Sequence, residues 1–155
     1  MRFHRNPVFA AAIAVSISAC GNGGVAERPA ADEEPEAPAA ASLPVSEPTG
    51  EIDEALAEAG EELFRTKGCV ACHTFGGGRL TGPDLAGVTQ RRTFPWIYHQ
   101  IMVPDSMTTH DPTAKQLMAE YMTQMPNLGL QPEDALALYE YLREQDAESA
   151  EEEDE

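Results

Sequence analysis

The middle of this 155-residue chain is predicted to fold as an all-α structure. Apolar residues recur there at three- and four-residue steps in four segments, and no sustained alternation of apolar and polar residues suggests a sheet. The connections at 74–92 and 123–131 are rich in glycine and proline, and they are too long for a simple bundle of this size. The sequence therefore predicts three to four main helices whose connections wrap around something.

The first two helices are placed by their apolar spacing and their end signals. The first is expected from about Asp53 to Lys67, because Gly68 supplies a stop after it. The second begins near Thr93 and ends before Pro104. The expected apolar side of the first helix consists of Leu56, Ala59, Gly60, Leu63 and Phe64.

The last two helices carry clear start signals. The third has Asp111 as its cap and Pro112 in its first turn, which are positions that both residue types favour. The fourth runs from Pro132 to about Gln145. Their apolar faces are Ala114, Leu117, Met118 and Tyr121 in the third, and Ala135, Leu138, Tyr139 and Leu142 in the fourth.

The charge balance excludes one class of partner. Ten lysines and arginines face 27 aspartates and glutamates, a formal net charge of −17, whereas a nucleic-acid binder needs a basic surface. The acids are concentrated outside residues 60–145, so the folded part is only mildly acidic. We expect no nucleic acid among the partners, and a protein partner that is basic or neutral.

The start of the chain resembles a bacterial export signal. Arg2 and Arg5 precede the short apolar run 8–19, which fits a secretory signal peptide and is too short to span a bilayer. Ile17-Ser18-Ala19-Cys20 resembles the lipobox, whose cysteine is lipidated and becomes the first mature residue. We therefore expect a lipid anchor at Cys20, on the periplasmic side of a bacterial membrane. An ordinary export signal or an uncleaved anchor is the alternative.

Composition divides the chain into four parts. Residues 1–19 are the predicted signal peptide, and residues 20–50 are an Ala/Pro/Glu-rich tether with too few large apolar residues to fold. Residues 51–145 are the predicted folded domain. Residues 146–155 are a predicted acidic tail.

One short motif indicates a cofactor. Cys69-Val70-Ala71-Cys72-His73 is the C-x-x-C-H haem-attachment sequence. Two thiols three residues apart can add to the two vinyl groups of one haem, and the histidine that follows can reach the iron. One covalent haem c per chain is expected. A redox dithiol would need a βαβ context that is missing, and a zinc site would need His99 or His110 as a further ligand.

With this motif, most of residues 55–145 resemble the class I, mono-haem cytochromes c. Gly60 to Phe64 looks like the first helix of that family, and Leu138, Tyr141 and Leu142 match its last helix. The resemblance implies the class I cytochrome c fold, with the helices around one haem c, and an electron carrier rather than an enzyme.

The resemblance also implies the axial ligands. Pro83 stands where the family has a carbonyl that accepts the Nδ1 proton of the ligating histidine, here His73. Met125 stands in the loop before the last helix, where the family has its sixth ligand. The alternatives are Met102, Met107, Met118 and Met122, of which Met118 and Met122 are interpreted as apolar filling on the third helix.

Arg91, Arg92 and Trp96 look like the groups that bond or screen haem propionates in this family, although a solvated arginine pair is an equally ordinary interpretation. With His73 and Met125 on the iron no coordination position is open, so electron transfer remains, at a potential raised by the thioether. Expected partners of this monomer are a quinol-oxidising complex as donor and a terminal oxidase or reductase as acceptor. A haem enzyme or gas sensor with an open sixth position is the alternative.

Overall fold

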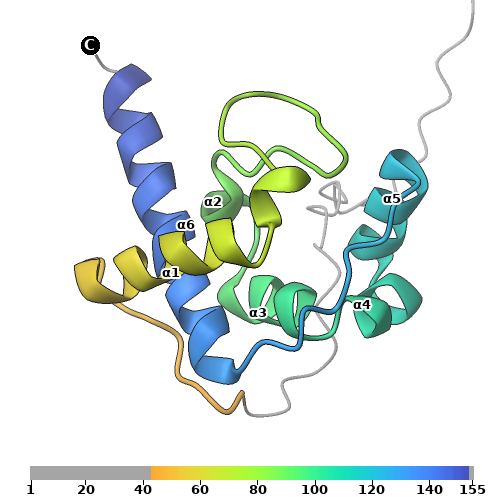
Figure 1. The fold of residues 1–155 in the computed structure, drawn as a ribbon, viewed down its shortest axis with the longest axis horizontal. Coiled ribbons are helices and arrows are strands. Elements are labelled where there is room, and N and C mark those ends of the chain that lie inside the picture. The colour runs from red at the N-terminus through yellow and green to blue at the C-terminus, as the bar shows by residue number, and fades with distance from the viewer. Residues whose placement is uncertain (1–42, 154–155) are drawn as a thin grey trace, which may run out of the picture. The chain divides into compact units, whose positions relative to one another are not determined.

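The computed structural model describes residues 43–153, so the predicted signal peptide, Cys20 and most of the predicted tether lie outside the described residues. No strand occurs in the described part, and the all-α prediction is confirmed. No helix between residues 43 and 153 is long and apolar enough to cross a membrane. The elements, drawn in Figure 1, are α1 (Glu54–Thr66), the 3-10 turn η1 (Cys69–Ala71), α2 (Val88–Arg91), α3 (Phe94–Met102), α4 (Pro104–His110), α5 (Pro112–Tyr121) and α6 (Pro132–Glu153).

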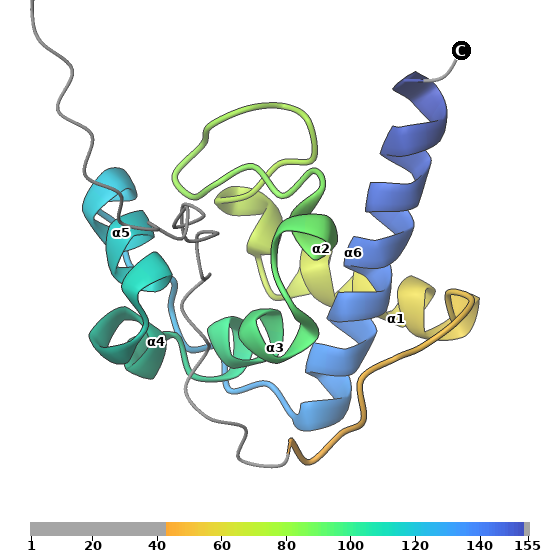
Figure 2. The same ribbon diagram turned by 180° about the vertical axis from the view of Figure 1, so that it is seen from behind.

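The crossing of α1 and α6 is the main helix contact, and Figures 1 and 2 show the two helices side by side from opposite directions. Gly60 makes the close approach possible. A Cβ at this position would lie 2.1 Å from the Ala137 carbonyl oxygen and 2.8 Å from the Tyr141 Cβ. Both atoms belong to the partner helix near its axis, so neither can move aside without shifting the helix.

The aromatic contact beside this crossing connects it to the rest of the domain. The Phe64 ring centroid lies 5.3 Å from that of Phe75 and 5.5 Å from that of Tyr141. Such tilted pairs add to the burial of apolar area. On α1 the sequence placed Ala59 on the apolar face. The structure buries Ala57 in its place and exposes Ala59, so this residue of the prediction is wrong.

The segment before α1 belongs to the folded domain. Leu43 and Val45 pack against the core, although the tether was expected to extend to residue 50. The Glu140 carboxylate, 2% exposed, accepts from the Asp53 N–H at 3.4 Å. Arg143 pairs with Glu140 and donates to the Gly50 carbonyl at 2.6 Å. Contacts with α6 therefore hold the chain before α1.

Two short helices and a helix extension differ from the expectation. Helix α2 lies inside the connection predicted at 74–92, and α4 fills the gap before α5. Helix α6 continues past the predicted end at Gln145 to Glu153. Asp146, placed by the sequence in the acidic tail, is 4% exposed and accepts hydrogen bonds from Gly87 N–H at 2.6 Å and Thr89 N–H at 2.8 Å. The carboxylate thus joins α6 to the start of α2.

Helix α3 supplies four of the nine buried residues of one core cluster. Phe94 packs edge-on against Tyr139 of α6, with ring centroids 4.8 Å apart. The remaining buried residues of this core cluster are Trp96, Ile97, Tyr98, Met107, Ala114, Ala135 and Leu142. Four residues of α3 also line a cavity between the helices and the long connections: Trp96, Ile97, Gln100 and Ile101.

Candidate functional site

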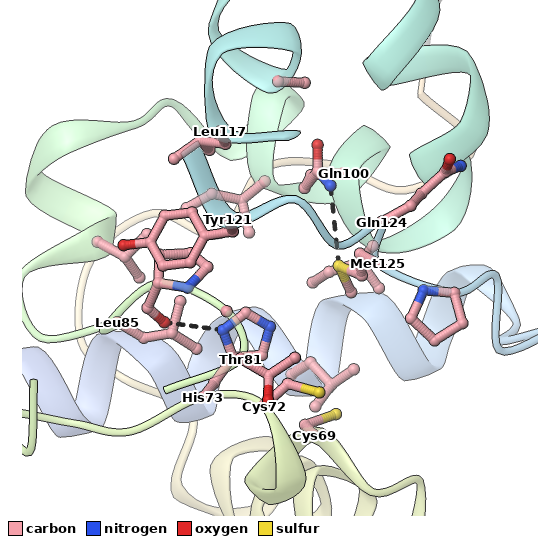
Figure 3. A pocket seen from close by; sticks show the side chains of 18 of the residues that line it. Cys69, Cys72, His73, Thr81, Leu85, Gln100, Leu117, Tyr121, Gln124 and Met125 are labelled. Carbon is pink, nitrogen blue, oxygen red and sulfur yellow. Dashed lines mark hydrogen bonds between the residues drawn. The ribbon is translucent and has the colours of Figure 1, made fainter. Parts of the chain in front are cut away.

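A cavity of about 270 Å³ opens between the C-x-x-C-H turn, α3, α5, α6 and the two long connections, and Figure 3 shows it from close by. Apolar atoms make up most of its surface, as in most cofactor sites, although polar and charged residues also line it. All site residues predicted within the described part of the chain line it: Cys69, Cys72, His73, Pro83, Arg91, Arg92, Trp96 and Met125.

The cysteines lie on a tight turn that follows α1. Gly68 adopts a left-handed conformation, φ 80°, which glycine adopts without strain, and it starts the 3-10 turn. The Cys69 carbonyl then accepts from the N–H groups of Cys72 and His73, both at 3.0 Å. Both thiols are free and half-buried, and burial raises the pKa of Cys69. In Figure 3 both sulfurs and the His73 ring belong to one side of the cavity.

The orientation of His73 is set by the connection that follows. Its Nδ1 lies 2.9 Å from the Pro83 carbonyl oxygen. Since a carbonyl only accepts, Nδ1 carries the proton and Nε2 keeps its lone pair. Gly82 stands directly against the ring, where a Cβ would lie 2.8 Å from His73 Cε1. This packing explains why a glycine precedes Pro83.

Asp84 organises the same connection, and sequence reasoning assigned it no role. Its carboxylate accepts from Thr74 Oγ1 at 2.8 Å, and from the N–H groups of Gly76 at 3.0 Å, Gly78 at 2.6 Å and Ala86 at 2.9 Å. Burial alone would raise the pKa of Asp84, but these bonds stabilise the charged form and lower its pKa to about 2. The only sequence signal is an aspartate that closely follows three glycines.

Met125 reaches the cavity from the connection between α5 and α6. Its side chain is half-buried, and Figure 3 shows the sulfur directed into the cavity. Gln100 of α3, which the sequence prediction missed, donates from Nε2 to Met125 Sδ at 3.8 Å. The Asn127 amide donates to the Met102 carbonyl at 3.3 Å and joins this connection to α3. Two segments far apart in sequence thus bring an imidazole and a thioether into one apolar space.

Comparison with known proteins identifies the family. The model of the family described as cytochrome c matches residues 57–146, more than half of the chain. The chain belongs to the cytochrome c family.

Solved structures agree with this assignment. A cytochrome c from Rhodothermus marinus is 40% identical, covers 66% of this chain and 88% of its own, and has a TM-score of 0.63. The cytochrome c domain of a Pseudomonas putida protein is 39% identical over 57% of this chain and 88% of its own, with a TM-score of 0.50. No curated protein matches the chain.

Arg91, Arg92 and Trp96 border the cavity of this cytochrome c. The Arg91 guanidinium hydrogen-bonds the Ala86 carbonyl, and the Arg92 guanidinium carbon lies 5.3 Å from the centroid of the Trp96 ring. Trp96 Nε1 is buried and has no hydrogen-bond partner in the part of the chain that the structure describes. A buried donor without a partner costs free energy unless something accepts from it.

The donor set fits haem c. Two thiols at the attachment spacing, an imidazole of fixed tautomer, a thioether and the unpartnered Trp96 N–H all border one apolar cavity. Covalent haem c is also what the family implies. Within residues 43–153, neither His99 nor His110 joins the cysteines in a cluster that could hold a metal ion.

The other methionines have different surroundings. Met107 lies in the core and is 3% exposed. Met102 is partly buried and packs against this core cluster, and Met118 borders the cavity. The interpretation of Met122 as apolar filling is wrong. Its backbone is left-handed at φ 54°, which ends α5 and turns the side chain into solvent, where it is 85% exposed.

Proposed function

We propose that this cytochrome c domain carries single electrons, with one haem c attached through Cys69 and Cys72 and ligated by His73 and Met125. The observation that supports this most directly is the shared cavity: the imidazole, the thioether and both thiols extend into it from two separate segments. The hydrogen bond from His73 to Pro83 supports ligation through Nε2, because it leaves that lone pair free and makes the ring a better donor.

Each residue would contribute a distinct property to the site. When bound, haem supplies a one-electron iron couple. His73 provides a nitrogen donor that is held in place, and the soft thioether of Met125 favours the reduced state and raises the potential. With His73 and Met125 both bound to the iron, no coordination position would be left for a substrate. Electron transfer is the function that this arrangement favours.

The ligand assignment is tested by optical spectroscopy of the full chain. Ferric haem with a methionine ligand has a weak absorption band at long wavelength, which an open or histidine-ligated haem lacks. We expect this band in the wild type and in Met122→Ala, the matched control, and its loss in Met125→Ala. A band that survives Met125→Ala would refute the assignment. Its absence from the wild type, with fast carbon monoxide binding, would favour the haem enzyme or sensor.

The membrane attachment is proposed from the sequence. Cys20 lies outside the described residues, and the lipobox-like segment before it supports its lipidation on the periplasmic side of a bacterial membrane. One acyl chain is a marginal anchor, whereas two or three hold firmly. Because residues 43–50 pack on the domain, the proposed tether is residues 20–42.

The proposed partners follow from the membrane attachment and from the acidic net charge of the chain, which excludes nucleic acid. A quinol-oxidising complex in the same membrane would donate electrons, and a terminal oxidase or reductase would accept them. The carrier would act as a monomer. Native membranes should therefore reduce the cytochrome with quinol and oxidise it with a terminal acceptor in stopped-flow measurements, and membranes that do neither would contradict the proposal.

A further inference from the structure

Arg79 joins the connection after η1 to the last turn of α5. Its Nη2 donates to the Glu120 carbonyl oxygen at 2.7 Å, and its Nη1 lies 3.5 Å from Glu120 Oε1. The guanidinium carbon stacks 4.2 Å from the centroid of the Tyr121 ring. Figures 1 and 2 both show the connection after η1 extending toward α5. We call these contacts of Arg79 with Glu120 and Tyr121 the Arg79 clasp.

One end of the clasp is fixed by Asp84. The carboxylate holds Thr74, Gly76 and Gly78 by the hydrogen bonds described above, directly before Arg79. Gly76 and Gly78 have φ of 71° and 81°, a conformation that other residues rarely adopt. Arg79 therefore extends from a loop of defined shape on the His73 side of the cavity.

The other end of the clasp lies next to the proposed sixth ligand. Tyr121 is the last residue of α5 and borders the cavity, Met122 turns the chain, and Met125 follows three residues later. Carbonyl groups in the last turn of a helix lack partners within it, and a cation there is favoured by the helix dipole. Arg79 supplies that cation to the Glu120 carbonyl. The clasp thus fixes the point from which the Met125 segment begins.

The geometry requires arginine. The Arg79 and Glu120 side chains are 54% and 49% exposed, so their ion pair by itself contributes little. The bond to the carbonyl and the stack on Tyr121 need a planar group that donates in its plane while one face lies on the ring, which lysine cannot do. These two contacts distinguish Arg79 from Arg65. The ion pair of Arg65 with Glu62 joins two exposed side chains of the same helix, α1.

We infer that Arg79 is a positioning residue that holds the Met125 segment closed over the cavity and so keeps the thioether on the iron. This inference rests on the proposed ligation by Met125. A ligand from solution can take the sixth position only after Met125 leaves, so its apparent affinity reports the fraction of molecules with the segment open. Loss of the clasp raises that fraction.

The test is an imidazole titration of the ferric full chain, followed by loss of the long-wavelength methionine band. Arg79→Ala should bind imidazole about ten-fold more tightly than the wild type, which corresponds to ~1.4 kcal/mol. Arg79→Lys keeps the charge but loses the stack, so it should fall between the two. Arg65→Ala, the matched control, should bind as the wild type does.

A double-mutant cycle separates the stack from a general loosening of the fold. Tyr121→Leu keeps an apolar group at the cavity wall and removes the ring. If the two side chains act together, Arg79→Ala in the Tyr121→Leu background should change the imidazole affinity less than it does in the wild type. Additive effects would overturn the stack as part of the clasp.

The outcomes separate this inference from the proposed function. A normal methionine band in the wild type, lost in Met125→Ala, together with an unchanged imidazole affinity in Arg79→Ala, would overturn the clasp alone. A wild type without the band would overturn both, because no methionine would then be on the iron.

Discussion

Replacing Asp84 by asparagine should destabilise the domain in a pH-dependent way. In the structure one carboxylate oxygen accepts from Gly76 and Ala86, and the other from Thr74 and Gly78. Asparagine would turn one of these oxygens into a donor that faces two donors. Net contributions of hydrogen bonds to charged groups are about 1.5–3 kcal/mol each, and partial exposure reduces them. We expect a loss of roughly 2–4 kcal/mol at pH 7.

The pH dependence follows from the lowered pKa. The pKa of Asp84 falls from an ordinary 3.8 to about 2 on folding, so the carboxylate stabilises the fold fully above pH 3.8. That stabilisation is lost as the pH falls from there through about 2. The pKa difference corresponds to roughly 2 kcal/mol. The gap in stability between the wild type and Asp84→Asn should therefore shrink over this pH range.

The assay is urea unfolding of the covalent haem protein at a series of pH values between 7 and 2. The control is Glu58→Gln, because Glu58 is exposed on α1 and its loss removes only one charge. A gap between wild type and Asp84→Asn that stays constant with pH, or no gap at pH 7, would refute the role given to this carboxylate.

Three further changes have defined outcomes. Cys20→Ala should release a covalently haem-loaded protein from the membrane fraction, since the acyl chains are its proposed anchor; tight binding with normal export would indicate another attachment. Met125→His should lower the reduction potential, because a second imidazole favours Fe(III), whereas Met122→His should leave it unchanged in redox titrations. Gly60→Ala should destabilise the fold by about 1–3 kcal/mol in urea unfolding, since its Cβ meets the Ala137 carbonyl at 2.1 Å. Equal stability would mean that α1 and α6 can separate without cost.

Local signals in the sequence determined much of this fold. The predicted helices correspond to α1, α3, α5 and α6, because apolar spacing and caps act within a few residues. Asp111 is an example: its carboxylate accepts from the Ala114 N–H at 2.8 Å, as the predicted cap requires. The attachment motif is equally local, since two thiols and a histidine within five residues need only one turn.

The boundaries of the predicted tether and tail were wrong because they depend on contacts with distant parts of the chain. The tether and tail boundaries were drawn by composition, which contains no information about packing. Leu43 and Val45 lie on the core, and Asp146 is buried, because distant parts of the chain cover them. The partners of Asp146 are 57 and 59 residues away. Likewise, Ala57 and Ala59 are the same residue type, and only the angle at which α1 meets α6 decides which is buried.

The sequence by itself determined the four longer helices, the haem-attachment motif and which methionine stands before the last helix. Only the tertiary structure decided which polar side chains support the site. The contacts of Gln100 with Met125 and of Arg79 with Tyr121 show no local pattern, because a hydrogen bond or a stack needs two groups at a set distance and angle. Those distances exist only after α3, α5 and the connections have packed, and they depend on contacts spread over the whole domain.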